Sequence, residues 1–225
     1  MSVSVYKKNY EYVSKLLDIE KQSPINIYSA LSFISSVYYP DQTINRFYRK
    51  IDHEKEKIGS LLCDRKKIRN ESLERMARKE VYEASAFTNI IGQGVAHEQD
   101  LSFRVFPFEI IETLKEIHCQ LKRYDNFEIA ITREVLPFIF LLTPPNTVLL
   151  DVRSNYEYQL LQGILIKDMR AYSVVKEEFD RIWSSQDTIT SKEHILNLID
   201  NSINDWVKGK SIDLSKWPSM LNTNR

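Results

Sequence analysis

Residues 127–152 read FEIAITREVLPFIFLLTPPNTVLLDV and contain three short apolar runs, at 127–131, 138–142 and 147–152. The runs are rich in β-branched and aromatic residues, and turn formers such as Pro144-Pro145-Asn146 separate them. This pattern predicts three strands. Because a half-exposed strand would alternate polar and apolar residues, the nearly continuous hydrophobicity indicates that helices cover both faces of these strands.

The flanking sequence supplies further strands and the covering helices. Alternating residues predict a strand over 81–87, followed by a loop through Gly92 and Gly94, and an apolar run predicts a strand over 161–166. Apolar residues three and four positions apart predict three helices, over 108–124, 169–184 and 191–208.

The C-terminal segment carries its own signals. The capping box Thr190-x-x-Glu193 is expected to open the last helix. Beyond Gly209, Leu214 and Trp217 are large apolar residues, which predicts that the tail docks on the domain.

The N-terminal third shows helical spacing almost throughout residues 5–80, which predicts three or four helices. Ser23 and Pro24 fit the cap and the first turn of the second helix, and Tyr38-Tyr-Pro-Asp41 marks its end. A domain boundary is expected near residue 75, where the periodicity changes.

The predicted fold class is α+β, a helical N-terminal module followed by a mixed β-sheet covered by helices. The helical module spans residues 1–75, the sheet-containing domain spans 76–185, and a C-terminal helix with its docking tail spans 186–225.

Composition restricts the function classes. The 225 residues contain 31 Lys plus Arg and 31 Asp plus Glu, so any polyanion must be bound by a local patch rather than by the field of the whole chain. Cys63 and Cys119 lack the spacing of redox or zinc motifs, which indicates reduced thiols and a cytoplasmic protein. No targeting segment is expected. The longest apolar stretch, 135–142, is far shorter than the roughly 20 residues that span a bilayer, so no membrane partner is predicted.

The order of elements resembles one half of the phospholipase-D-like fold over about residues 76–185. The ending is the most similar part: Gln162-Gly-Ile-Leu-Ile-Lys-Asp168 precedes a helix that closes in Glu178-Phe-Asp-Arg-Ile-Trp183. This ending resembles the degenerate phospholipase-D-like domains attached to prokaryotic transcriptional regulators. The resemblance implies a sensor or dimerisation domain, and a homodimer, since the superfamily commonly pairs two such halves.

Active members of that superfamily carry H-x-K-x4-D, in which His attacks phosphorus and Lys stabilises the developing negative charge. In the matching register this chain has Pro137, Ile139 and Pro144. None of these side chains can attack, donate or carry charge. The resemblance therefore implies a catalytically inactive domain.

A basic segment is the first candidate site. Residues 46–75 hold ten Lys or Arg against six Asp or Glu, and 29–50 faintly resembles a helix-turn-helix. A nucleic-acid contact there competes with a solvated helical face, which explains the same charges. The candidate nucleic-acid-binding residues are Arg46, Arg49, Lys50, Arg65, Lys66, Lys67 and Arg69.

Charged residues at predicted strand ends, together with a histidine in the loop after the first strand, form the second candidate site. Ligands collect at the ends of strands in open sheets, although strand ends are also charged simply because they meet solvent. The four histidines lack metal-ligand spacing, so neither a metal nor a cofactor is expected. The candidate pocket residues are His97, Arg133, Asp151, Arg153 and Lys167.

The sequence thus favours a non-enzymatic regulatory or binding protein, in which a module that contacts DNA or another protein is joined to an inactive sensor or dimerisation domain. Two alternatives stay open. One is an enzyme acting on nucleic acid or nucleotides through an unrecognised site, and the other is an adaptor subunit of a larger assembly, for example in defence.

Overall fold

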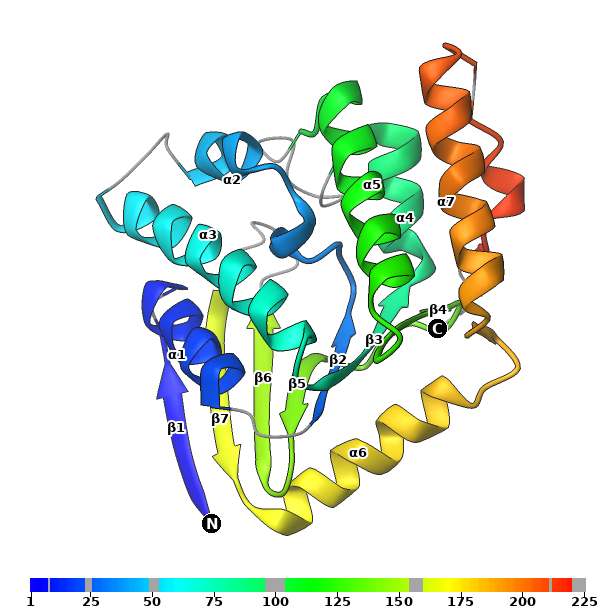
Figure 1. The fold of residues 1–225 in the computed structure, drawn as a ribbon. Coiled ribbons are helices and arrows are strands. Elements are labelled where there is room, and N and C mark those ends of the chain that lie inside the picture. The colour runs from blue at the N-terminus through cyan, green and yellow to red at the C-terminus, as the bar shows by residue number, and fades with distance from the viewer. Residues whose placement is uncertain are drawn as a thin grey trace.

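The computed structural model describes residues 1–7, 9–22, 26–48, 53–95, 104–153, 160–210 and 212–219. Within them the strands form one eight-stranded sheet in the order β1-β7-β6-β5-β2-β3-β4-β8 (Figure 1). Strands β2, β3 and β4 are parallel to one another, and the other neighbours pair antiparallel. The predicted α+β class, with a mixed sheet covered by helices, is confirmed.

Helices and strands follow one another along the whole chain. Their bounds, in chain order, are β1 Ser2–Tyr6, α1 Asn9–Gln22, β2 Asn26–Leu31, η1 Ser36–Tyr38, α2 Asp41–Tyr48, α3 His53–Leu73, β3 Ala77–Glu83, α4 Ala84–Gln93, α5 Pro107–Arg123, β4 Phe127–Thr132, β5 Ile139–Thr143, β6 Thr147–Arg153, β7 Leu160–Lys167, α6 Met169–Trp183, β8 Thr188–Ile189, α7 Lys192–Val207 and η3 Leu214–Lys216.

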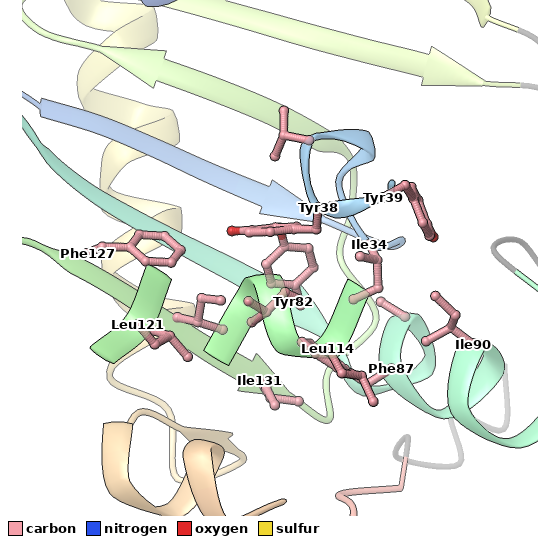
Figure 2. Packing of buried hydrophobic residues seen from close by; sticks show 14 of the residues in the cluster. Ile34, Tyr38, Tyr39, Tyr82, Phe87, Ile90, Leu114, Leu121, Phe127 and Ile131 are labelled. Carbon is pink, nitrogen blue, oxygen red and sulfur yellow. The ribbon is translucent and has the colours of Figure 1, made fainter. Parts of the chain in front are cut away.

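The central strands of the sheet are buried on both faces, as the apolar runs predict. The larger core joins one face to helices α1, α3, α4, α5 and α7, and Figure 2 shows part of it around Tyr38, Tyr82 and Leu114. The smaller core joins the other face to α6 through Phe179 and Ile182. Figure 1 shows α6, in yellow, set apart from the other helices. Residues that alternate along each central strand therefore enter two different cores.

The second half of the sequence folds nearly as predicted. Helices α5, α6 and α7 and strands β4 to β7 lie within one or two residues of the expected ranges. Asp168 begins α6, since its carboxylate accepts the N–H groups of Arg170 and Ala171 at 2.9 and 3.0 Å. The cap of α7 differs from the prediction, because Ser191 rather than Thr190 accepts a hydrogen bond, from the N–H of His194.

The N-terminal third differs most from the prediction. The helix expected after Pro24 is wrong, because residues 26–31 form β2, which pairs with β3 on one side and β5 on the other. The helix-turn-helix over 29–50 is wrong for the same reason. Residues on both sides of the boundary expected near residue 75 contribute strands to one sheet and side chains to one core.

The segment around β3 differs from its prediction, whereas the C-terminal tail agrees with it. The strand expected over 81–87 begins earlier, at Ala77, and ends at Glu83. Residues 84–93, expected as the end of that strand and the start of a loop, form helix α4. Trp217 is 4% exposed, as expected for a docked tail. Its indole stacks on Phe87 with ring centroids 5.0 Å apart, and its Nε1 donates to Oγ of Ser202 at 3.1 Å.

Candidate ligand cavity and buried ion network

Five charged side chains and two tyrosines form a network inside the larger core. Arg78, Glu80 and Tyr82 alternate along β3, so all three point to the face covered by α1 and α3. Residues four apart in α3 share a helix face, which brings two arginines over the same strand. The buried ion network consists of Glu20, Arg65, Arg69, Arg78 and Glu80, with Tyr38 and Tyr82.

Glu20 of α1 is the first acceptor of the network and is fully buried. Arg65 binds it in a bidentate manner, with Nε and Nη2 donating at 2.7 and 2.9 Å. Nη1 of Arg78 donates to the same carboxylate at 2.8 Å. One glutamate of α1 is thus held by α3 and by the sheet.

Glu80 is the second acceptor and is likewise fully buried. Its Oε1 accepts from Nη1 of Arg69 and from Nε of Arg78, both at 2.6 Å. Its Oε2 accepts the hydroxyl groups of Tyr38 and Tyr82 at 2.7 and 2.8 Å. Nη2 of Arg69 also donates to the hydroxyl of Tyr38. Every oxygen of the carboxylate is therefore paired.

The two carboxylates stay ionised in this interior. Burial opposes ionisation of Glu20, but the charges of Arg65 and Arg78 more than offset it, and the pKa of Glu20 falls to about 2. Burial likewise opposes ionisation of Glu80, and Arg69 and Arg78 again outweigh it, so its pKa lies well below the ordinary value. For Tyr38 and Tyr82 burial raises the pKa well above the usual range.

With the tyrosines neutral, three arginines face two glutamates, and the network carries one excess positive charge. Replacing a buried ion network by apolar groups is often harmless, whereas removing one partner is costly. The excess charge lies beside a cavity.

That cavity has a volume of about 110 Å³ and lies between the sheet and the helices α1, α2 and α3. Its floor comes from β2, β5 and β6, and most of its wall is apolar. The lining residues are Tyr12, Val13, Leu16, Ser29, Leu31, Phe33, Ile34, Ser35, Ser36, Tyr39, Ile44, Phe47, Leu62, Arg65, Arg78, Ile139, Phe140, Leu141 and Asp151.

Polar groups occupy two separate places on the cavity wall. Ser29 is level with Glu80, two residues from Arg78 on β3, and Arg65 and Arg78 both bind Glu20, so these three residues belong to one place. Oγ of the buried Ser29 has no hydrogen-bond partner within the described ranges. Asp151, 5% exposed, belongs to the other. Ser29 of β2 is level with Leu141 of β5, which is level with Leu149 of β6. Asp151 follows Leu149 by two residues, so Ser29 and Asp151 lie two strands apart. Standard sheet spacings separate the two Cα atoms by roughly 12 Å.

The basic segment proves to be divided between interior and surface. Arg65 and Arg69 are buried in the ion network, 8% and 0% exposed. The prediction that these two side chains face outward to contact nucleic acid is therefore wrong. Arg46 pairs with the buried Glu109 at the start of α5, and Lys66 donates to Tyr39 and Asp41. Lys67 is exposed. Arg49 and Lys50 lie outside the described residues.

The strand-end charges do not converge on one pocket. Asp151 lines the cavity, whereas Arg133 contacts Asp187 and Ser219 at the end of β4, four strands away, or roughly 19 Å in sheet spacing. Lys167 is level with Thr147, at the opposite end of the strands from Asp151. Residue 153 ends β6, but the side chain of Arg153 lies outside what the structure describes, as does His97.

The three positions that match H-x-K-x4-D are also separated. Ile139 is level with Asp151 and lines the cavity, and Pro137 is exposed just before β5. Pro144 lies in the turn between β5 and β6, at the other end of the hairpin. Among the described residues no group of three or more His, Cys, Asp or Glu could hold a metal ion. The described helices include none that is long and apolar enough to cross a membrane.

Sequence reasoning missed most of the network and the cavity. Ser29 was assigned to a helix, and Glu20 and Arg78 were not singled out. The alternation Arg78-x-Glu80-x-Tyr82 is a signal that could have located the charged face of β3, because a charged face on a central strand needs buried partners.

No family model matches the chain, and no curated protein matches it. Solved structures give low-identity likenesses. The archaeal chromatin protein TrmBL2 matches with a TM-score of 0.45 and 14% identity over 84% of this chain and 54% of that one, so this chain spans about half of its length. NUC from Salmonella typhimurium, a phospholipase D family member, matches with a TM-score of 0.44 and 12% identity, over 84% of this chain and 99% of that one. NucT from Helicobacter pylori matches with a TM-score of 0.46 and 8% identity over the same shares. Likenesses at this level carry no information about the chemistry of this chain.

Proposed function

We propose that this protein is a non-enzymatic regulatory protein that binds a small molecule in the cavity between α1, α3 and the sheet. The observation that carries the proposal is the cavity itself, about 110 Å³ with an apolar wall and a few buried polar groups. Ligand sites generally combine an apolar lining with a small number of convergent polar groups. A cavity of similar size, about 150 Å³, is known to hold a benzene ring.

Ligand binding would connect the helices α1, α2 and α3 to the sheet. Tyr12 and Leu16 of α1, Leu62 of α3 and Ile44 of α2 all line the cavity, so a ligand would fix these helices on the sheet. Whatever binds only the folded arrangement stabilises it. A ligand-dependent position of α2 and α3 is the physical basis we propose for regulation.

A macromolecular partner belongs to the same proposal. We propose that the partner is DNA or another protein and that the chain acts as a phospholipase-D-like homodimer. To test whether DNA is the partner, binding to duplex DNA is measured at low and moderate salt for the wild type and for the Lys66→Ala/Lys67→Ala variant. Salt-sensitive binding that the variant loses supports DNA as the partner, and its absence leaves a protein partner.

Ligand-observed NMR with benzoate, benzamide, benzamidine and benzyl alcohol tests the cavity. Val13 of α1 lines it, and Val13→Phe fills it, while Val175→Phe makes the same change on α6, on the opposite face of the sheet. We expect at least one probe to bind the wild type and Val175→Phe but not Val13→Phe, with circular dichroism showing that both variants fold. Failure of all four probes to bind the wild type would overturn the proposal.

A further inference from the structure

The arginines beside the cavity have donor groups left over. Arg65 uses Nε and Nη2 on Glu20, and Arg78 uses Nε on Glu80 and Nη1 on Glu20. No hydrogen bond of the described residues involves Nη1 of Arg65 or Nη2 of Arg78. Both arginines line the cavity, and they are 8% and 1% exposed. Each guanidinium carries five N–H donors, so both arginines can still donate to a group placed in the cavity.

Two independent features indicate what the acceptor is. The network has three arginines for two glutamates, so a single negative charge would neutralise it. Oγ of Ser29 lies on the same cavity without a partner and can donate to the same group. Guanidinium groups bind carboxylates with short, charge-assisted hydrogen bonds that a neutral acceptor does not match.

The remainder of the cavity restricts the rest of the ligand. Its wall includes the aromatic rings of Tyr12, Phe33 and Phe47, which suit an apolar or aromatic body. Asp151 lies on the wall roughly 12 Å from Ser29 in sheet spacing, whereas the ion pairs of Arg65 and Arg78 are with Glu20 and Glu80. Its carboxylate disfavours a second negative charge at that end.

We infer that the cavity binds a small monoanionic carboxylate with an apolar body, whose carboxylate lies at Ser29, Arg65 and Arg78 and whose body extends toward Asp151. This inference rests on the proposed function, because it names the ligand class of the same cavity. Binding requires no covalent step. The anion would complete the buried ion network.

Benzoate, benzamide and benzamidine test the inference, because they share one shape and differ in charge. Isothermal titration of the wild-type protein should give benzoate an affinity about tenfold or more above that of benzamide, and benzamidine the weakest of the three. Ser29→Ala should weaken benzoate about fivefold, since it removes one donor, and should leave benzamidine unchanged. Val13→Phe should abolish the benzoate signal and Val175→Phe should retain it.

The outcomes separate this inference from the proposed function. Equal affinities for benzoate and benzamide, or a preference for benzamidine, in a site that Val13→Phe blocks would overturn the anionic ligand and keep the cavity as a binding site. Benzoate binding that Val13→Phe does not affect would place the anion elsewhere and overturn the inference as well. Absence of binding by every probe would overturn both.

Discussion

Tyr12 of α1 lies against Gly163 of β7 so closely that a Cβ atom at Gly163 would fall 2.2 Å from Cδ2 of the tyrosine ring. Gly163 is the residue level with Asp151 in the sheet. A glycine is required here for close approach rather than for an unusual backbone angle. The pair fixes the distance between α1 and β7, the strand that pairs with β6 beside the cavity.

Gly163→Ala should therefore destabilise the protein by about 1–3 kcal/mol, the usual cost of overpacking. Urea denaturation measures the effect. In a Tyr12→Leu background the same substitution should cost less, because the smaller side chain leaves room for the methyl group. An equal cost in both backgrounds would show that the ring does not press on Gly163.

Arg69 and Lys67 provide a matched pair on α3. Arg69 is fully buried and pairs with Glu80 at 2.6 Å, whereas Lys67 is exposed. Arg69→Ala should cost about 3–5 kcal/mol, because it leaves a buried carboxylate without one of its partners. Lys67→Ala should change the free energy of unfolding by no more than about 0.5 kcal/mol. Chemical denaturation of both variants checks this, and similar small effects would contradict the buried network.

Much of the second half of the fold was predictable because its signals are local. The apolar stripes of α5, α6 and α7 recur every three or four residues, and the turn at Pro144-Pro145-Asn146 is a run of three turn formers. The segment 26–31 gives no such signal. Ile27, Leu31 and Ile34 fit helical spacing, yet the segment forms a central strand because β3 and β5 pair with it. Long-range pairing outweighs local propensity at this point.

The candidate site was harder to predict for the same reason. A basic helix reads alike in sequence whether its arginines face solvent or buried acids. Arg65 meets Glu20, 45 residues away, and Arg69 meets Glu80, 11 residues away. Asp151 was predicted as a pocket residue and does line the cavity, but the groups that share the cavity with it come from α1, α2, α3, β2, β3, β5 and the segment 33–39.

Trp217 ties the C-terminal tail to the core, stacking on Phe87, which is fully buried. Trp217→Ala should cost about 3–5 kcal/mol, since it removes a large buried side chain and leaves a cavity. Val207→Ala, at a residue that is 68% exposed near the same end of the chain, serves as the control and should be nearly neutral. Thermal denaturation compares them. A small effect of Trp217→Ala would mean that the tail is not part of the cooperative unit.

The depressed pKa of Glu20 predicts an acid-sensitive stability. Its pKa falls from 4.5 to about 2 because Arg65 and Arg78 outweigh the effect of burial. The unfolded chain therefore binds more protons between these values, and the stabilisation present above about pH 4.5 is lost as the pH falls toward about 2. A shift of this size corresponds to roughly 3 kcal/mol. Urea midpoints measured from pH 6 down to about pH 2 should fall across this window.

Glu20→Gln should be less stable at neutral pH and should show a shallower fall with pH. Asp18→Asn, at a half-exposed residue of the same helix, should keep the wild-type slope. An unchanged slope in Glu20→Gln would show that Glu20 is not the group that makes the fold acid-sensitive.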